Sequence, residues 1–351
     1  MNTSLSFATQ VVEWQRRHGR HSLPWQNTRD PYRVWLSEVM LQQTQVATVL
    51  GYYERFLQAF PNVAALAAAP LDDVLALWSG LGYYSRARNL HRCAQVVVAE
   101  HGGCFPPSSA ALATLPGIGR STAAAIAAFC FGERVAILDG NVKRVLTRVL
   151  GFGGDLADAA RERDLWALAT DLLPQNGIEP YTQGLMDLGA TLCSARTPQC
   201  PMCPVRSGCV AARAGEPERY PVKTRKLKRG QREHVWLWLQ WQDKLWLQQR
   251  PQTGVWAGLW SLPEFDSPDS FEQASAAWPG MCEPLPSFTH TLTHLDWTLH
   301  PLRWTLPPRT GAVRVAHVVR LWPTGRWFSV GDALASGLPA PLRKLLTTFV
   351  L

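Results

Sequence analysis

Four of the eight cysteines lie within one short segment, with the spacing Cys193-x6-Cys200-x2-Cys203-x5-Cys209. In a chain without a secretory signal, such a group indicates a metal site rather than a disulfide framework. Four thiolates suit either a tetrahedral zinc ion or a [4Fe–4S] cluster. The spacing lacks the two paired Cys-x2-Cys knuckles typical of zinc, so it favours the [4Fe–4S] cluster. We expect it to close the end of a helical domain and fix the shape of segment 193–209.

The positive charge of the chain is concentrated in residues 219–232. This segment has seven Lys or Arg and no Asp or Glu, whereas residues 1–218 have a net charge of +1 and residues 233–351 have none. A basic strip attracts polyanions, first of all nucleic acid. A solvated linker is the equally weighted alternative.

The character of the sequence changes at this basic segment. Before it, Ala and Leu recur at helical spacing, as in residues 121–130 and 160–173, and Asp30-Pro31 is a typical helix start. We expect nine to ten helices and no strand before residue 195. After it, residues 235–241 and 244–249 predict a hairpin, 292–304 and 312–322 further strands, and 341–350 a closing helix.

These patterns predict a multi-domain chain with an all-α domain at 1–218, the linker 219–232 and a smaller α+β domain at 233–351. No apolar run approaches the roughly 20 residues of a membrane span, and the N-terminus lacks a secretory signal. We therefore expect an intracellular protein without membrane contact.

A glycine-containing loop at 115–122, LPGIGRST, separates two helical segments. Gly117 and Gly119 allow a tight turn, and the N–H groups that open the next helix suit a phosphate. For the glycines alone, a plain turn between helices is the better explanation. With Arg120 and a helix on each side, contact with a DNA backbone becomes as strong an interpretation.

Two carboxylates stand out within the helical part. Asp139 precedes a helix, where a helix cap is sufficient reason for an aspartate. Glu38 lies among apolar neighbours in a helical segment, where an acid usually faces solvent. If it faces a pocket instead, burial raises its pKa and makes it a general acid.

Five motifs follow one another in a specific order: LSEVMLQQT at 36–44, GLGYY at 80–84, LPGIG at 115–119, LDGNVKR at 138–144 and the cysteine cluster. Together they resemble the helix-hairpin-helix DNA glycosylase superfamily and, within it, the MutY family of adenine DNA glycosylases. The resemblance implies an all-α helix-hairpin-helix glycosylase domain with an iron–sulfur loop, followed by an α+β Nudix-like domain.

The resemblance also implies roles for individual residues. Glu38 is the expected acid and Asp139 the second carboxylate, while Trp25 and Gln183 match positions of the adenine pocket. A protonated Glu38 donates to adenine N7 of a nucleotide rotated out of the duplex, and an ionised Asp139 stabilises or briefly traps the sugar cation.

Further residues match positions that contact DNA. Gln43 and Tyr83 resemble residues that enter the base stack, and Thr44 one that touches the estranged base. Gly117, Gly119 and Ser121 belong to the hairpin that holds phosphate. Strand-cutting members carry a lysine where Ser121 stands, so we expect a monofunctional enzyme, with Schiff-base trapping by Lys143 only as a side reaction.

The C-terminal third resembles the Nudix-related domain that reads 8-oxoguanine opposite the adenine. The magnesium-binding helix of a Nudix hydrolase is not matched, because residues 270–280 offer only Glu272. Residues 292–294 resemble the family's lesion-reading Phe-Ser-His: His294 keeps the imidazole and Thr293 keeps the hydroxyl of the serine, whereas Leu292 replaces the aromatic residue. His290 is as easily explained as a strand-end histidine.

We therefore expect a base excision repair enzyme that removes adenine paired with 8-oxoguanine or guanine in double-stranded DNA. The resemblance further implies a monomer in a bacterial-type cytoplasm, associated with the nucleoid, with a sliding clamp or downstream repair enzymes as partners. Two alternatives are an endonuclease-III-like glycosylase for oxidised pyrimidines and a catalytically silent iron–sulfur DNA-binding module. A third is a nucleotide pyrophosphatase.

Overall fold

The computed structural model describes residues 6–224 and 228–350, which fall into two compact units. One unit extends to Ala67 and resumes at Arg92, continuing as far as the basic segment. The other combines Ala68–His91 with the C-terminal residues. The boundaries expected at residues 218 and 232 follow chain order and stay a prediction.

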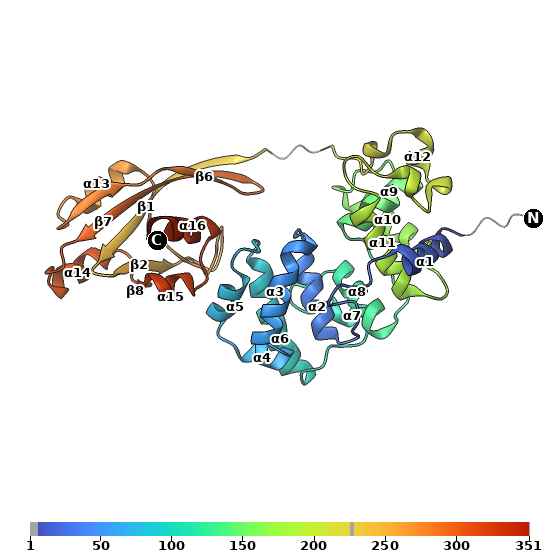
Figure 1. Cartoon of the computed structure of the whole chain (residues 1–351), viewed down its shortest axis with the longest axis horizontal. Coiled ribbons are helices and arrows are strands. Elements are labelled where there is room, and N and C mark those ends of the chain that lie inside the picture. The colour runs from blue at the N-terminus through green and yellow to red at the C-terminus, as the bar shows by residue number, and fades with distance from the viewer. Residues whose placement is uncertain (1–5, 225–227, 351) are drawn as a thin grey trace, which may run out of the picture. The chain divides into compact units, whose positions relative to one another are not determined.

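The N-terminal part is helical, as expected (Figure 1). Between residues 6 and 195 the helices are α1 (Phe7–His18), α2 (Pro31–Leu41), α3 (Val46–Ala59), α4 (Val63–Ala68), α5 (Leu71–Trp78), α6 (Ser85–His101), α7 (Ser109–Leu112), α8 (Arg120–Phe131), α9 (Gly140–Leu150), α10 (Ala159–Asp171) and α11 (Ile178–Thr191). The count exceeds the predicted nine to ten because α4 and α7 have only six and four residues.

Helix α2 begins as the sequence predicts. The Asp30 side chain accepts a hydrogen bond from the Tyr32 N–H, and Pro31 occupies the first helical position. Residues 34–37, 39 and 40 are buried in the core, so this helix is anchored on both sides of Glu38. The helices expected at 121–130 and 160–173 are confirmed as α8 and α10.

A hydrophobic core joins α1 to α8, α9, α10 and α11. Its fully buried members include Val142 on α9, Leu165 on α10 and Leu188 on α11. Gly189 allows α11 to approach the start of α9, because a Cβ there would lie 2.6 Å from the Cβ of Asn141. This packing fixes the N-terminal end of α9, where Asp139 is the N-cap.

Beyond α11 the chain forms short helices around the cysteines. They are the 3₁₀ helices Cys200–Met202, Arg206–Gly208 and Pro217–Arg219, together with α12 (Val210–Ala214). Of the basic segment, residues 225–227 lie outside the described residues, and residues 230–232 already belong to the first strand.

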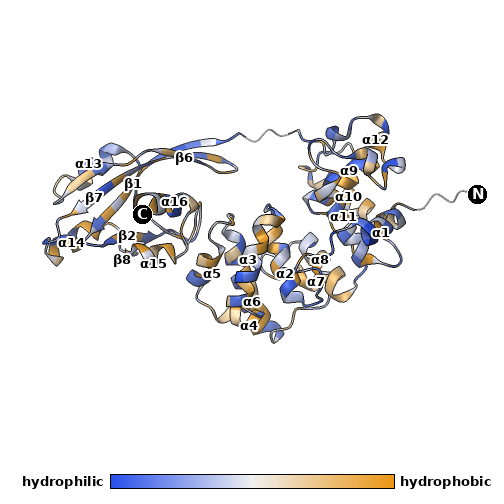
Figure 2. Cartoon of the chain, viewed as in Figure 1, coloured by the Kyte–Doolittle hydropathy of each residue, from blue (hydrophilic) through white to orange (hydrophobic). Residues whose placement is uncertain are grey.

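The C-terminal residues form a mixed eight-stranded sheet with the central order β3-β2-β1-β7-β5. The strands are β1 (Gly230–Trp241), β2 (Lys244–Gln249), β3 (Trp260–Ser261), β4 (Glu264–Phe265), β5 (Met281–Pro284), β6 (Phe288–Thr291), β7 (Leu295–Leu306) and β8 (Gly325–Ser329). Strand β1 pairs in parallel with β7 and antiparallel with β2, which confirms the predicted hairpin and its two-residue turn. The first residues of β1 are hydrophilic and exposed, and its central residues are buried (Figure 2).

The helices of this unit are α13 (Pro268–Ser275), α14 (Ala312–Val319), α15 (Val330–Leu334) and α16 (Ala340–Val350). The expected closing helix is confirmed as α16, but the strand expected at 312–322 is wrong. Its valines favour a strand, yet Val315, Val318 and Trp322 are buried at helical spacing while Val313 is 86% exposed. Packing of this helical face in the core overrides the β propensity of valine.

Residues 68–91 belong to the same unit because they bind the C-terminal elements. Asp72 on α5 accepts a hydrogen bond from the Trp260 indole (3.3 Å), and the Tyr84 hydroxyl donates to the Leu338 carbonyl (2.9 Å). In the part of the chain that the structure describes, no helix is both long and apolar enough to cross a membrane.

Candidate active site

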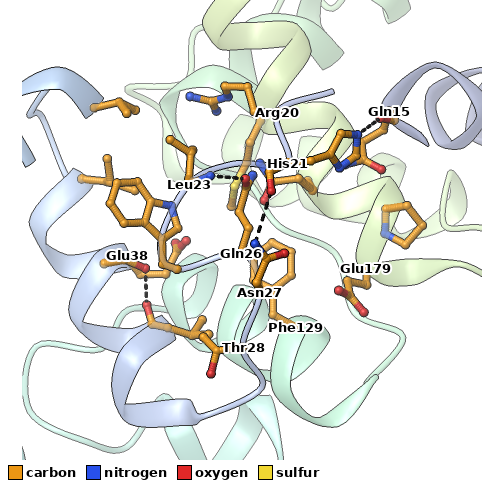
Figure 3. Close-up of a pocket in the computed structure, with 18 residues that line it drawn as sticks. Gln15, Arg20, His21, Leu23, Gln26, Asn27, Thr28, Glu38, Phe129 and Glu179 are labelled. Carbon is orange, nitrogen blue, oxygen red and sulfur yellow. Dashed lines mark hydrogen bonds between the residues drawn. The ribbon is translucent and has the colours of Figure 1, made fainter. Parts of the chain in front are cut away.

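A cavity of about 260 Å³ lies between α2 and α11, and Glu38 contributes to its wall (Figure 3). Trp25 and Gln183, the two residues expected in an adenine pocket, line it as well. Trp25 is buried and packs edge-to-face against Tyr53, with ring centroids 5.3 Å apart. The structure therefore brings three predicted site residues together around one cavity.

Glu38 has the properties of an acid that keeps its proton. Burial, and secondarily the negative charge of Asp139, raise the pKa of Glu38 from 4.5 to about 8. No hydrogen bond to another residue of the described ranges engages its carboxyl group. At neutral pH this group is a proton donor facing the cavity.

Asp139 lies close enough to influence Glu38 but has different surroundings. Its carboxylate accepts the Val142 N–H at 2.7 Å as the N-cap of α9. Burial raises the pKa of Asp139, whereas the N–H groups of Val142 and Asn141, together with Arg144 and Lys143, lower it. The N–H donors and the helix N-terminus favour the anion of Asp139 and so oppose the effect of its burial.

Ser121 helps to place Asp139. Its Oγ accepts a hydrogen bond from the N–H of Leu138 at 3.0 Å. Gly119 is the N-cap of α8, and Gly117 has a φ of 75°, so the glycine loop turns tightly as predicted. The Arg120 guanidinium lies 4.0 Å from the centre of the Trp166 ring.

Gln43 and Thr44 lie in the turn between α2 and α3. Gln43 is exposed and has a φ of 57°, which is unusual for a residue other than glycine. The N–H of Thr44 donates to the carbonyl of Leu41 at 3.3 Å. Backbone strain of this kind recurs at functional sites and keeps the exposed Gln43 side chain at the tip of the turn.

Tyr83 shares this backbone strain and touches the predicted lesion-reading loop. Its φ is 47°, its side chain is 47% exposed, and its hydroxyl lies 3.0 Å from the Oγ1 of Thr293. Thr293 and His294 are exposed at the tip between β6 and β7. His290 on β6 packs against the Trp256 ring (5.5 Å), and burial lowers its pKa.

The four clustered cysteines line one small apolar cavity together with Val145, Leu188 and Val205. Burial and, to a smaller extent, the charges of the other three cysteines raise the pKa of Cys203 to about 11, against the lowering effect of the Val205 N–H, so the four thiols interact. Among residues 6–224 and 228–350, no three His, Cys, Asp or Glu side chains are arranged to hold one metal ion.

Two further residues lie at or beside the cavity without a recognised sequence motif, Gln26 and Asp187. Gln26 lines it, and its Nε2 is buried without a hydrogen-bond partner in the described structure. Asp187 is completely buried and accepts hydrogen bonds from Arg20 and Gln183. The only sequence signal for Asp187 is its position four residues after Gln183, on the same helix face.

Both parts of the chain match known protein families. Residues 36–170 match the family model of the HhH-GPD superfamily base excision DNA repair protein, and residues 234–348 match that of the NUDIX domain. The adenine DNA glycosylase of Buchnera aphidicola subsp. Acyrthosiphon pisum is 34% identical over 354 residues, which cover 99% of this chain and 98% of that protein. The human adenine DNA glycosylase is 43% identical over 222 residues, 61% of this chain and 40% of its own length.

Solved structures show the same helical fold. A thermostable thymine-DNA glycosylase superimposes with a TM-score of 0.54 at 29% identity, covering 59% of this chain and 95% of its own. A non-covalent endonuclease III–DNA complex gives a TM-score of 0.51 at 22% identity, with 59% and 94% coverage. The all-α domain followed by an α+β Nudix-like domain is thereby confirmed.

Proposed function

The chain belongs to the adenine DNA glycosylase family and acts in base excision DNA repair, and from this premise we propose its substrate and mechanism. The substrate is double-stranded DNA in which adenine is paired with 8-oxoguanine or guanine. The reaction hydrolyses the N-glycosidic bond and leaves an abasic site. Action on the chromosome implies a place in a bacterial-type cytoplasm, at the nucleoid.

One observation carries the mechanism: the negative charge of Asp139 raises the pKa of Glu38, and the Asp139 carboxylate is held at the N-terminus of α9, where it accepts the Val142 N–H. The two carboxyl groups therefore divide the roles of acid and anion, as in glycoside hydrolysis. The Glu38 proton is delivered to N7 of an adenine in the cavity, which makes the base a neutral leaving group.

Asp139 acts on the sugar that remains. Departure of the base leaves an oxocarbenium-like cation, and an anion held at the N-terminus of α9 stabilises it or traps it briefly before water attacks. The Ser121–Leu138 hydrogen bond holds the backbone directly before Asp139. Ser121 therefore positions the anion and has no base of its own to make it a nucleophile.

The residues at the two expected positions of an amine nucleophile, 121 and 143, support a monofunctional reaction. The lysine of strand-cutting relatives is replaced by Ser121, and the Nζ of Lys143 is paired with Glu162 at 2.5 Å. Attack on the sugar by Lys143 requires release from that ion pair, so trapping by Lys143 stays a side reaction.

Recognition of the opposite base is assigned to Tyr83, Thr293 and His294. The Tyr83–Thr293 contact joins the residue expected in the base stack to the loop expected to read the lesion. Gln43, presented by its strained turn, is the second residue proposed for the stack. Gly117 and Gly119 are proposed to let a DNA phosphate approach the N–H groups at the start of α8.

The four cysteines are proposed as ligands of one [4Fe–4S] cluster, which their shared apolar cavity fits. When bound, the cluster supplies four strong iron–thiolate bonds that fix segment 193–209. The chain contributes Arg148, which is almost fully buried and donates hydrogen bonds to the Sγ of Cys193 and to the carbonyls of Ser194 and Ala195.

The Glu38→Gln variant tests the assignment directly. Glutamine keeps the shape of the side chain but has no acidic proton to donate to N7. We expect normal binding of an A:8-oxoguanine duplex with adenine release lowered by a factor of roughly 10² to 10⁴. Unchanged release would refute the role of Glu38, and release of oxidised pyrimidines instead of adenine by the wild-type protein would refute the substrate.

A further inference from the structure

Two glutamines line the cavity that Glu38 faces, Gln183 from α11 and Gln26 from the segment before α2. A glutamine amide has a donor end and an acceptor end of nearly the same shape. Which group of a ligand it recognises therefore depends on which end already makes a hydrogen bond within the protein. In this structure each amide is tied at a different end.

The donor end of Gln183 is bound to Asp187. Its Nε2 donates to the Asp187 Oδ1 at 2.9 Å, one helical turn further along α11. A carboxylate only accepts hydrogen bonds, so it holds the NH₂ group of Gln183 toward Asp187. The Oε1 of Gln183, which no other described residue engages, is left for the cavity.

Asp187 is itself held rigidly. It is fully buried, and Arg20 donates to it twice, from the backbone N–H to Oδ2 (2.9 Å) and from Nε to Oδ1 (2.6 Å). Asp187 does not line the cavity, whereas Arg20 and Gln183 do. Any influence of Asp187 on a bound base must therefore pass through its neighbours.

Gln26 is tied at the opposite end. Its Oε1 accepts the N–H of Leu23 at 3.1 Å, and a backbone N–H can only donate, so the NH₂ group turns away from Leu23. That Nε2 is buried and has no partner in the described structure. A buried, unpaired donor on a cavity wall indicates an acceptor on the missing ligand.

The free ends match adenine and oppose guanine. When Glu38 donates to N7, the next group on that edge of adenine is the N6 amine, a donor that suits the Oε1 of Gln183. Guanine and hypoxanthine present the acceptor O6 there. Adenine N1 is an acceptor that suits the Nε2 of Gln26, whereas N1 of guanine or hypoxanthine carries a proton.

We propose that Asp187 is a positioning residue that sets base specificity by fixing the Gln183 amide, and that Gln26 supplies the complementary donor. This inference rests on the proposed function, since it names how the same cavity selects its base. It assigns the selection to hydrogen-bond direction, in addition to the fit of the ring against Trp25.

The test compares adenine with hypoxanthine, each opposite 8-oxoguanine, in single-turnover assays of the full chain with its cluster loaded. Hypoxanthine keeps N7 for Glu38 but reverses the hydrogen-bonding character at both other positions. In Asp187→Asn the new amide can donate to Gln183 and turn it, so its NH₂ group faces the cavity. We expect the ratio of adenine to hypoxanthine release to fall by about tenfold or more.

Thr191→Val is the matched control, because the Thr191 hydroxyl donates to the backbone carbonyl of Asp187 and does not touch Gln183. It should keep the wild-type ratio. Gln183→Leu is the second variant, which removes the free Oε1 without altering the buried ion pair, and it should lower the ratio as well. It carries the test if Asp187→Asn does not fold with its cluster absorbance intact.

The outcomes separate the two proposals. If the wild-type protein prefers adenine and the variants lose this preference, the inference is supported. If Asp187→Asn or Gln183→Leu lowers both rates by the same factor, the inference is overturned while the proposed function stands. If the wild-type protein releases no adenine, the proposed function itself fails.

Discussion

Replacing Glu38 by glutamine should stabilise the folded protein while it stops base removal. The surroundings of Glu38 raise its pKa from 4.5 to about 8. At about 1.4 kcal/mol per pKa unit, ionising this carboxyl group is about 5 kcal/mol less favourable in the folded protein than in the unfolded chain. Glutamine does not ionise and avoids this penalty.

The sign and pH range follow from linkage. Between about pH 4.5 and pH 8 the unfolded chain has released this proton and the folded protein has not, so the wild-type free energy of unfolding falls by about 1.4 kcal/mol per pH unit from this group. This pH-dependent contribution of Glu38 is absent below its pKa in the unfolded chain, 4.5, and constant above its pKa in the folded protein, about 8. The free energy of unfolding of the variant, relative to that of the wild type, should therefore be about 3 kcal/mol larger at about pH 7 than at about pH 4.

Urea unfolding at about pH 5, pH 6, pH 7 and pH 8 measures this difference for the unit that contains Glu38. Glu54→Gln on the exposed side of α3 is the control for loss of a surface carboxylate, and its stability should follow the wild type. The reasoning is refuted if the difference between Glu38→Gln and wild type stays constant over this range, or if the variant becomes relatively less stable as pH rises.

The same pKa predicts the pH dependence of the reaction. Only the protonated form of Glu38 donates to the base, so the single-turnover rate should fall about tenfold per pH unit above pH ~8. The reaction also requires the Asp139 anion, and the pKa of Asp139 is raised above 3.8. The rate should therefore also fall as the pH is lowered, and this fall should begin at a pH above 3.8. A rate that rises through pH 8 would contradict the assignment of Glu38 as acid.

Three further predictions follow from the site. Asp139→Asn keeps the α9 cap, since Asn accepts the Val142 N–H equally well. The free energy of unfolding should therefore change by less than about 1 kcal/mol, while adenine release falls about 10³-fold. A large loss of stability together with the loss of activity would indicate a structural role for Asp139. Tyr83→Phe removes only the hydroxyl that contacts Thr293, so the preference for 8-oxoguanine over guanine opposite adenine should shrink, and an unchanged preference would remove this contact from recognition. Cys203→Ala removes one proposed cluster ligand, so iron content and visible absorbance should fall, and full retention of both would exclude this ligand.

Local signals in the sequence predict local structure in this chain. Asp30-Pro31 marks the start of α2, and the apolar runs around Gln242-Asp243 mark the β1–β2 hairpin. Both depend on neighbouring residues alone. The segment 312–322 shows the limit, because its valines favour a strand and only the core contacts of Val315 and Val318 make it a helix.

The chemistry of the site depends on residues far apart in the chain. Glu38 and Asp139 are separated by 100 residues, and neither sequence context shows that they interact or that one keeps its proton. The motifs supplied these residues through family resemblance. Asp187 and Gln26 belong to no such motif, and only the folded structure shows which end of each amide remains free.

The most direct test of the central claim is a single-turnover assay on a duplex with one adenine opposite 8-oxoguanine, with and without hot alkali. The protein should carry its cluster absorbance, so that inactivity cannot be assigned to lost folding. We predict strand cleavage at the adenine only after alkali, which reports base removal without a lyase step. Cleavage without alkali would contradict the monofunctional mechanism based on Ser121, and no cleavage in either case would contradict adenine removal itself.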